Sequence, residues 1–104
     1  MTQPDETRIQ LCGRFVVRLD GRRVDDALAG ARGQLLFAYL VLNRLRRIDR
    51  DELLIAVYGE EATAGHHPRL SVLLSKLRRV IGPGLLAGRA QLELVLPALS
   101  LIHI

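Results

Sequence analysis

The residues best suited to bind a ligand lie in one segment of the chain, residues 68–81. It combines long cations, small hydroxyls and one β-branched apolar residue at helical spacing: Arg69, Ser71, Val72, Ser75, Lys76, Arg78 and Arg79. No acidic residue occurs between Glu61 and Glu93. A basic segment without acids suits a polyanionic partner, although a solvated arginine-rich face has the same composition.

The segment has two chemically different faces when its residues are placed at 100° steps around a helix. One narrow sector, which we expect to face the core, holds Leu70, Leu74, Leu77 and Ile81. The basic and hydroxyl side chains occupy the opposite half, with Arg78 on its border. Such a helix fits the major groove of B-DNA, where cations reach guanine edges or phosphates and Val72 would contact a thymine methyl. We expect base contacts from Ser71, Ser75 and Lys76, and phosphate contacts from Arg78 and Arg79. The alternative is an ordinary amphipathic helix with a basic outer face.

The N-terminal part of the chain is predicted to form a small antiparallel sheet. Residues 8–19 alternate as two short strands with a turn at Gly13. A third short strand, residues 22–24, follows the turn signal Asp20-Gly21. This sheet must pack against the helices that follow it.

Two further helices are predicted before residue 68. In the first, residues recur at three- and four-residue spacing as a core-facing stripe: Leu35, Ala38, Tyr39 and Leu42, widened by Leu36, Leu40 and Val41. The second starts at Asp49, which we expect to form a capping box with Glu52. We expect Gly59 to end it in the left-handed conformation, and Pro68 to be the first residue of the third helix. The basic turn from Arg44 to Arg50 would add phosphate contacts.

The chain is predicted to end in a β-hairpin, residues 85–96, with its tip between Gly88 and Ala90. The resulting fold class is α+β: a winged helix-turn-helix with an N-terminal antiparallel sheet, three helices and a C-terminal β-hairpin wing. Residues 8–97 form one domain, which suits a chain of 104 residues. Residues 98–104 form an apolar tail.

Enzyme chemistry, cofactors and metals are not expected. Cys12 is the only cysteine, which excludes an intrachain disulfide and a cysteine-based zinc cluster, and we expect a buried thiol. The pair His66-His67 lacks a nearby third ligand. The acid pairs Asp25-Asp26 and Glu60-Glu61 stand in polar connectors, without a pocket to shift a pKa. No apolar run is long enough to span a bilayer, and the polar N-terminus favours a cytoplasmic location.

Three stretches of the chain resemble the OmpR-type winged-helix family. Leu70–Gly82 resembles its recognition helix, because Ser75-Lys-Leu-Arg-Arg79 matches the Ser-Arg-Leu-Arg-Arg-like run of that family. Asp51–Gly59 resembles the second helix, which often ends in Leu-Trp-Gly. The opening, residues 9–15 with Asp20-Gly21, resembles the SARP-like (AfsR-type) branch of bacterial transcriptional regulators.

The resemblance covers residues 8–97 and implies sequence-specific binding of double-stranded DNA in bacterial transcription regulation. It implies a four-stranded N-terminal sheet, helix 68–81 in the major groove, and wing 85–96 with Arg89 at the flanking minor groove or backbone. It implies contact with RNA polymerase through loop 59–66 and additional protomers on direct repeats. Regulators of this branch usually continue into a helical transcriptional activation domain, which is missing here. The protein would be cytoplasmic and associated with the nucleoid when bound to DNA.

The sequence departs from that family at three places. Leu73 replaces a polar residue of the recognition helix, so we expect it to pack against the core. Ala90-Gln-Leu-Glu93 replaces the common Gly-Tyr-Arg pattern of the wing, and Glu93 would oppose a phosphate. Residues 99–104 resemble a translated adapter sequence, so we expect a non-native end of a fragment; the alternative is an edge strand. The alternative function is a winged-helix protein–protein interaction module without DNA binding, and RNA binding is disfavoured by the scarcity of exposed aromatic residues.

Overall fold

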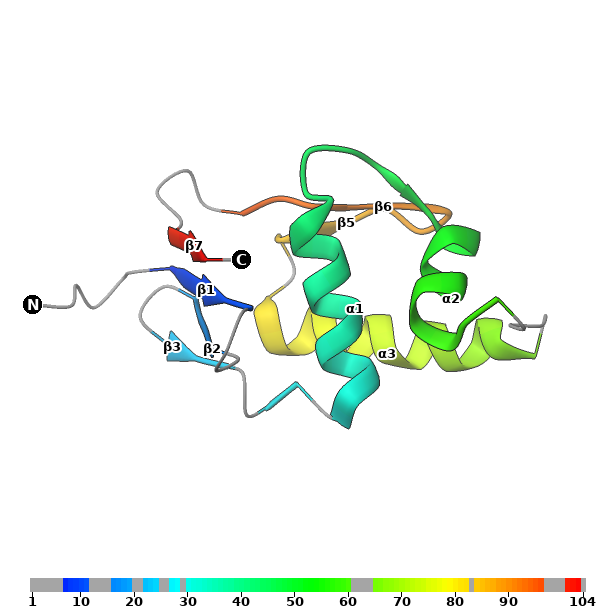
Figure 1. Cartoon of the computed structure of the whole chain (residues 1–104), viewed down its shortest axis with the longest axis horizontal. Helices are drawn as coiled ribbons and strands as arrows, with labels where there is room; N and C mark the ends of the chain where they lie inside the picture. Colours follow the sequence, from blue (N-terminus) through cyan, green and yellow to red (C-terminus); the bar gives the residue numbers. More distant parts are fainter. Residues whose placement is uncertain are drawn as a thin grey trace, which may run out of the picture.

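The computed structural model describes residues 7–11, 16–19, 22–24, 27–28, 30–60, 65–82, 84–96 and 101–103. Strands come first, then three helices, then an antiparallel hairpin (Figure 1), which confirms the predicted α+β winged helix-turn-helix. In the described part of the chain, no helix has the length and apolar character needed to cross a membrane. Some predicted features lie outside the described residues: Cys12, Gly13, Asp20-Gly21, Asp25-Asp26 and residues 61–64 of loop 59–66.

In the described residues, the N-terminal sheet has four strands in the order β3-β2-β1-β7. Strands β1 (Arg8–Gln10) and β2 (Val16–Leu19) pair antiparallel, as predicted, and bury the facing residues Ile9 and Val17. Strand β3 (Arg22–Arg23) pairs antiparallel with β2. The fourth strand, β7 (Leu101–His103), comes from the C-terminal tail and pairs parallel with β1 (Figure 1). The tail therefore takes the edge-strand arrangement that the sequence left as the alternative.

Helix α1 (Gly30–Leu42) buries the residues that widened the predicted stripe, and not the stripe's own leucines. Its buried residues are Leu36, Phe37, Leu40 and Val41. Leu35 and Leu42 are 45% and 51% exposed, because they lie on the opposite side of the helix from that group. The prediction was wrong for Leu35 and Leu42 because α1 is apolar almost all round, so only its contacts with α2, α3 and the hairpin select the buried side.

Helix α2 (Arg50–Tyr58) follows a two-residue strand, β4 (Ile48–Asp49), that the sequence did not predict. The predicted capping box is absent, because both of its side chains have other partners. Asp49 makes no cap bond, and its Oδ1 accepts a 2.9 Å hydrogen bond from Gln91 Nε2. Glu52 turns to Arg46 and Tyr39. Gly59 ends the helix at a φ of +91°, but its ψ of 172° is extended and not left-handed helical.

Helix α3 (His66–Ile81) begins two residues before the predicted start. Pro68 still lies in the first turn, where a helix has no partner for its N–H groups. The predicted core side is confirmed, since the buried residues are Leu70, Leu74, Leu77 and Ile81. Leu73 is half-buried against the core, as predicted from its departure from the family pattern.

The wing is an antiparallel hairpin of β5 (Leu86–Ala87) and β6 (Gln91–Leu94), with its turn at residues 88–90 as predicted. Strand β4 pairs with β6, so the wing sheet has three strands in the order β4-β6-β5. In Figure 1, α2 stands between this sheet and α3, and α1 runs from beside the sheet across α3. The buried wing residues Leu92 and Leu94 join Ile48 in the common core, which anchors the hairpin to the helices.

Candidate nucleic-acid interface

The side of α3 opposite the core forms one open surface. Its hollow has a volume of about 310 Å³ and is lined by Ser71, Val72, Ser75, Lys76 and Arg79. Five of the sequence-predicted site residues therefore lie together. Val72 is 53% exposed although it is apolar. Arg69 is exposed on the same helix but does not line this hollow.

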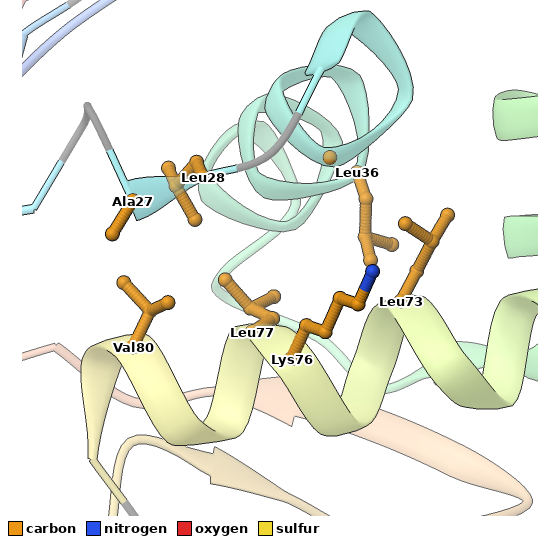
Figure 2. Close-up of a pocket in the computed structure, with 8 residues that line it drawn as sticks. Ala27, Leu28, Leu36, Leu73, Lys76, Leu77 and Val80 are labelled. Carbon is orange, nitrogen blue, oxygen red and sulfur yellow. The ribbon is translucent and has the colours of Figure 1, made fainter.

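Lys76 lies where this surface meets a second, apolar pocket between α1 and α3. The pocket is lined by Ala27, Leu28, Gly33, Leu36, Leu73, Lys76, Leu77 and Val80 (Figure 2). In the close-up, the Lys76 side chain extends from α3 toward Leu36 of α1. A lysine in this position covers apolar surface with its stem while its ammonium stays accessible. Lys76 therefore has a packing role as well as a charge.

Arg50, at the start of α2, contacts the first half of α3. Its Nη2 donates a 3.1 Å hydrogen bond to the carbonyl of His67 and a second one to Ser71 Oγ. Because a guanidinium has no acceptor, Ser71 accepts in this bond and keeps its own proton to donate elsewhere. The partners are 21 residues apart, and no sequence pattern signals the pairing.

Arg78 contacts the wing, in contrast to the open position of Arg79. Its Nε donates a 3.4 Å hydrogen bond to the Leu86 carbonyl, and its Nη2 donates to the Gly88 carbonyl. Arg89, the predicted wing contact, is exposed in the turn that follows. The basic residues predicted to contact DNA therefore have three different positions. Lys76 and Arg79 lie on the open side of α3, Arg89 lies in the wing turn, and Arg78 links α3 to the wing.

The wing turn depends on glycine at position 88. Gly88 has a φ of +94°, and a Cβ added there would lie 1.8 Å from the carbonyl oxygen of Gln91. No other residue fits without moving the turn. The next part of the turn is held from α2, because the Arg50 backbone N–H donates a 3.0 Å hydrogen bond to the Ala90 carbonyl.

Glu93, the acidic residue of the wing, lies beside a cation. Its Oε2 is 3.8 Å from Nε of Arg47, and the two side chains are 40% and 73% exposed, respectively. Arg47 therefore offsets part of the repulsion that Glu93 would exert on a phosphate.

A separate polar cluster joins the end of α1 to α2. Glu52 accepts hydrogen bonds from Arg46 and from the Tyr39 hydroxyl, and Arg46 also donates to Asn43. The hydrogen bonds from Arg46 and then Tyr39 hold the pKa of the Glu52 carboxyl at about 2. Tyr39 and Arg46 each donate a hydrogen bond to Glu52, and that bond raises the pKa of each donor. These groups connect two helices and lie apart from the α3 surface.

The two adjacent histidines have different neighbours. The ring of His66 lies 4.9 Å from that of Tyr58, and His67 Nε2 lies 3.6 Å from Asp51 Oδ1. Among the residues that the structure describes, no group of three or more His, Cys, Asp or Glu side chains is arranged to hold a metal.

No model of a known protein family matches this chain. No curated protein matches its sequence either. The interpretation of the α3 surface therefore depends on its own residues and their geometry.

Proposed function

We propose that this chain binds double-stranded DNA sequence-specifically and acts in bacterial transcription regulation. In the proposed complex, α3 enters the major groove, and the wing meets the flanking minor groove or backbone through Arg89. Ser71, Ser75 and Lys76 contact base edges, Val72 contacts a thymine methyl, and Arg69 and Arg79 contact phosphates. The protein would act in the bacterial cytoplasm, without catalytic activity.

One observation supports this proposal above the others: the exposed side of α3 combines cations and small hydroxyls in a helix without a carboxylate. Small side chains allow a helix backbone to approach base edges, and cations replace the counterions of the phosphates. A helix with its side chains is about 10–12 Å across, which matches the width of the major groove, about 12 Å.

The test is a titration of a fluorescent mixed-sequence duplex, with anisotropy measured at several salt concentrations. We expect log Kd to rise with log salt by about 0.9 for each phosphate contact. The variant Lys76→Gln/Arg79→Gln should lose at least about tenfold in affinity at low salt. Glutamine keeps most of the side-chain length, so the loss reports charge and not the packing of the Lys76 stem.

The matched control is Arg8→Gln/Arg18→Gln, which removes the same charge from the N-terminal sheet. It should keep both the affinity and the salt dependence close to those of the unchanged protein. Equal losses in the two variants would reduce the effect to net charge and reject α3 as the contacting surface.

A protein-interaction module is the second candidate, and a specific observation favours it. Leucines of α1 and of the turn that follows it are exposed: Leu35 by 45%, Leu42 by 51% and Leu45 by 93%. Leu35 and Leu42 are seven residues apart and therefore share one side of α1, and an apolar surface shared by several side chains is typical of protein contact surfaces. If this is the main function, DNA binding is absent at low salt, and partner binding depends on these leucines with little effect of salt.

A further inference from the structure

We propose that Arg78 is a positioning residue that holds the wing in place for DNA, and that it does not itself contact a phosphate. The inference rests on the proposed function for its effect on DNA binding. The contacts that support it are within the protein alone. It changes the role assigned to Arg78 from the sequence.

The guanidinium of Arg78 bridges one end of α3 and one edge of the wing. It donates to the carbonyls of Leu86 and Gly88, which lie at the first residue of β5 and at the start of the turn. A planar guanidinium with donors at fixed positions can hold two carbonyls at once, which a lysine ammonium does with less geometric control. Gly88 is the residue before Arg89, so the bond to its carbonyl sets the path of the backbone that presents Arg89.

The wing turn is held at further points, all from the α2 end of the molecule. The Arg50 N–H donates to the Ala90 carbonyl, and Gln91 donates to the Asp49 carboxylate. Together with Arg78, these bonds fix the residue before Arg89 and the two after it. Arg78 is the contribution of α3 to this arrangement, and it is half-buried whereas its neighbour Arg79 is exposed.

The positioning role predicts that Arg78 and Arg89 act as one unit. If Arg78 acts through the wing, its removal abolishes the contribution of Arg89, and removing both costs no more than removing one. If Arg78 has its own phosphate, the two losses add. The two models differ also in salt dependence, since each phosphate contact contributes about 0.9 to the slope.

The first experiment needs no DNA. Limited trypsin digestion of Arg78→Ala, followed by mass spectrometry, measures cleavage after Arg89 relative to cleavage after Arg69. We expect cleavage after Arg89 to be about tenfold faster and cleavage after Arg69 to be unchanged. About tenfold is the factor by which loss of one charged hydrogen bond at a partly exposed site favours local opening. General unfolding accelerates both sites equally, and that result overturns the proposal. Arg79→Ala is the matched control and should leave both rates unchanged.

The second experiment is a double-mutant cycle of Arg78→Ala and Arg89→Ala in the duplex titration. We expect each single variant and the double variant to lose the same affinity and the same increment of salt slope, about 0.9. Arg78→Lys should recover part of the affinity, since it restores one donor toward the wing carbonyls. Additive losses, with the slope lower by about 1.8 in the double variant, place Arg78 at its own phosphate and overturn the proposal.

The outcomes separate this inference from the proposed function. If the unchanged protein binds no duplex, the proposed function is wrong, and the digestion alone decides whether Arg78 holds the wing. If the protein binds DNA and cleavage after Arg89 is the same in Arg78→Ala, the positioning role is wrong while DNA binding stands.

Discussion

At the residue scale, the side chains of Asp49 and Glu52 bond to residues outside the first turn of α2. Asp49 and Glu52 have the spacing of a capping box, but Asp49 bonds to the wing residue Gln91, and Glu52 bonds to Arg46 and Tyr39. The Glu52 carboxylate would be charged in a capping box as well, but Arg46 adds a second, opposite charge, so the bond between them is also an ion pair. Electrostatics therefore decides the orientation of Glu52 over local helix preference.

The pKa of Glu52 predicts how acid affects this connection. The folded-state pKa of about 2 lies below the usual 4.5, so the network stabilises the fold above about pH 4.5 and is lost as pH falls toward 2. The effect should be about 1 kcal/mol or less, since the Glu52 side chain is 33% exposed and solvent screens the pair. Thermal unfolding at pH 7 and pH 3 checks this: Glu52→Gln should lower Tm at pH 7 and reduce the loss of Tm on acidification.

The control for that experiment is Glu60→Gln, which removes an exposed glutamate just beyond α2. Its Tm should follow that of the unchanged protein at both pH values. Identical pH profiles for Glu52→Gln and the unchanged protein would contradict the role assigned to the network.

At the element scale, the helices differ in how strongly their own sequence specifies their orientation. In α3, cations and hydroxyls occupy one side and aliphatic residues the other, so the 3.6-residue period alone identifies the buried side. In α1, apolar residues occur on all sides, and burial of Phe37 instead of Leu35 follows from the neighbours of the helix. The α3 surface was therefore predictable, and the α1 core stripe was predictable only in part.

Helix α1 also contains a glycine that its conformation does not require. Gly33 lies inside the helix beside the apolar pocket, and an added Cβ would be 3.8 Å from the Leu28 carbonyl carbon, an ordinary contact. Alanine restricts the unfolded chain and favours the helix, so Gly33→Ala should raise the free energy of unfolding by about 0.5–1 kcal/mol. The urea midpoint measures the change.

Gly30 provides the matched comparison in the same helix. It has a φ of +67°, a conformation that side chains other than glycine disfavour, so Gly30→Ala should lower the urea midpoint. A loss of stability for Gly33→Ala would show that the helix cannot accept the added methyl group and would reject the prediction.

At the scale of the whole molecule, the two ends of the described chain meet in one sheet. Strand β7 pairs with β1 along Arg8–Gln10, and Ile102 packs partly buried against the core. The domain therefore includes residues that the sequence assigned to a separate tail. The family resemblance implied four N-terminal strands; in the described residues, three strands of this sheet come from the N-terminal segment and the fourth comes from the C-terminal tail.

This arrangement predicts a stability role for the tail. Deleting residues 99–104 removes the β7 ladder and the Ile102 side chain, so the free energy of unfolding should fall by about 1–3 kcal/mol. Urea unfolding measures the loss, and Ile102→Ala should reproduce the part that comes from packing. An unchanged midpoint after the deletion would mean that the strand adds nothing to the fold.

The amino-acid sequence by itself determined the order of the main elements, the two faces of α3 and the tip of the wing. These features depend on local periodicity, on turn residues such as Gly88 and on the separation of charged from aliphatic side chains. Tertiary structure alone decided the buried side of α1, the short strands β4 and β7, and the partners of Arg50, Glu52 and Arg78. Strands of two or three residues have too few positions to show a period, and a long cation bonds to whichever acceptor the fold brings within reach.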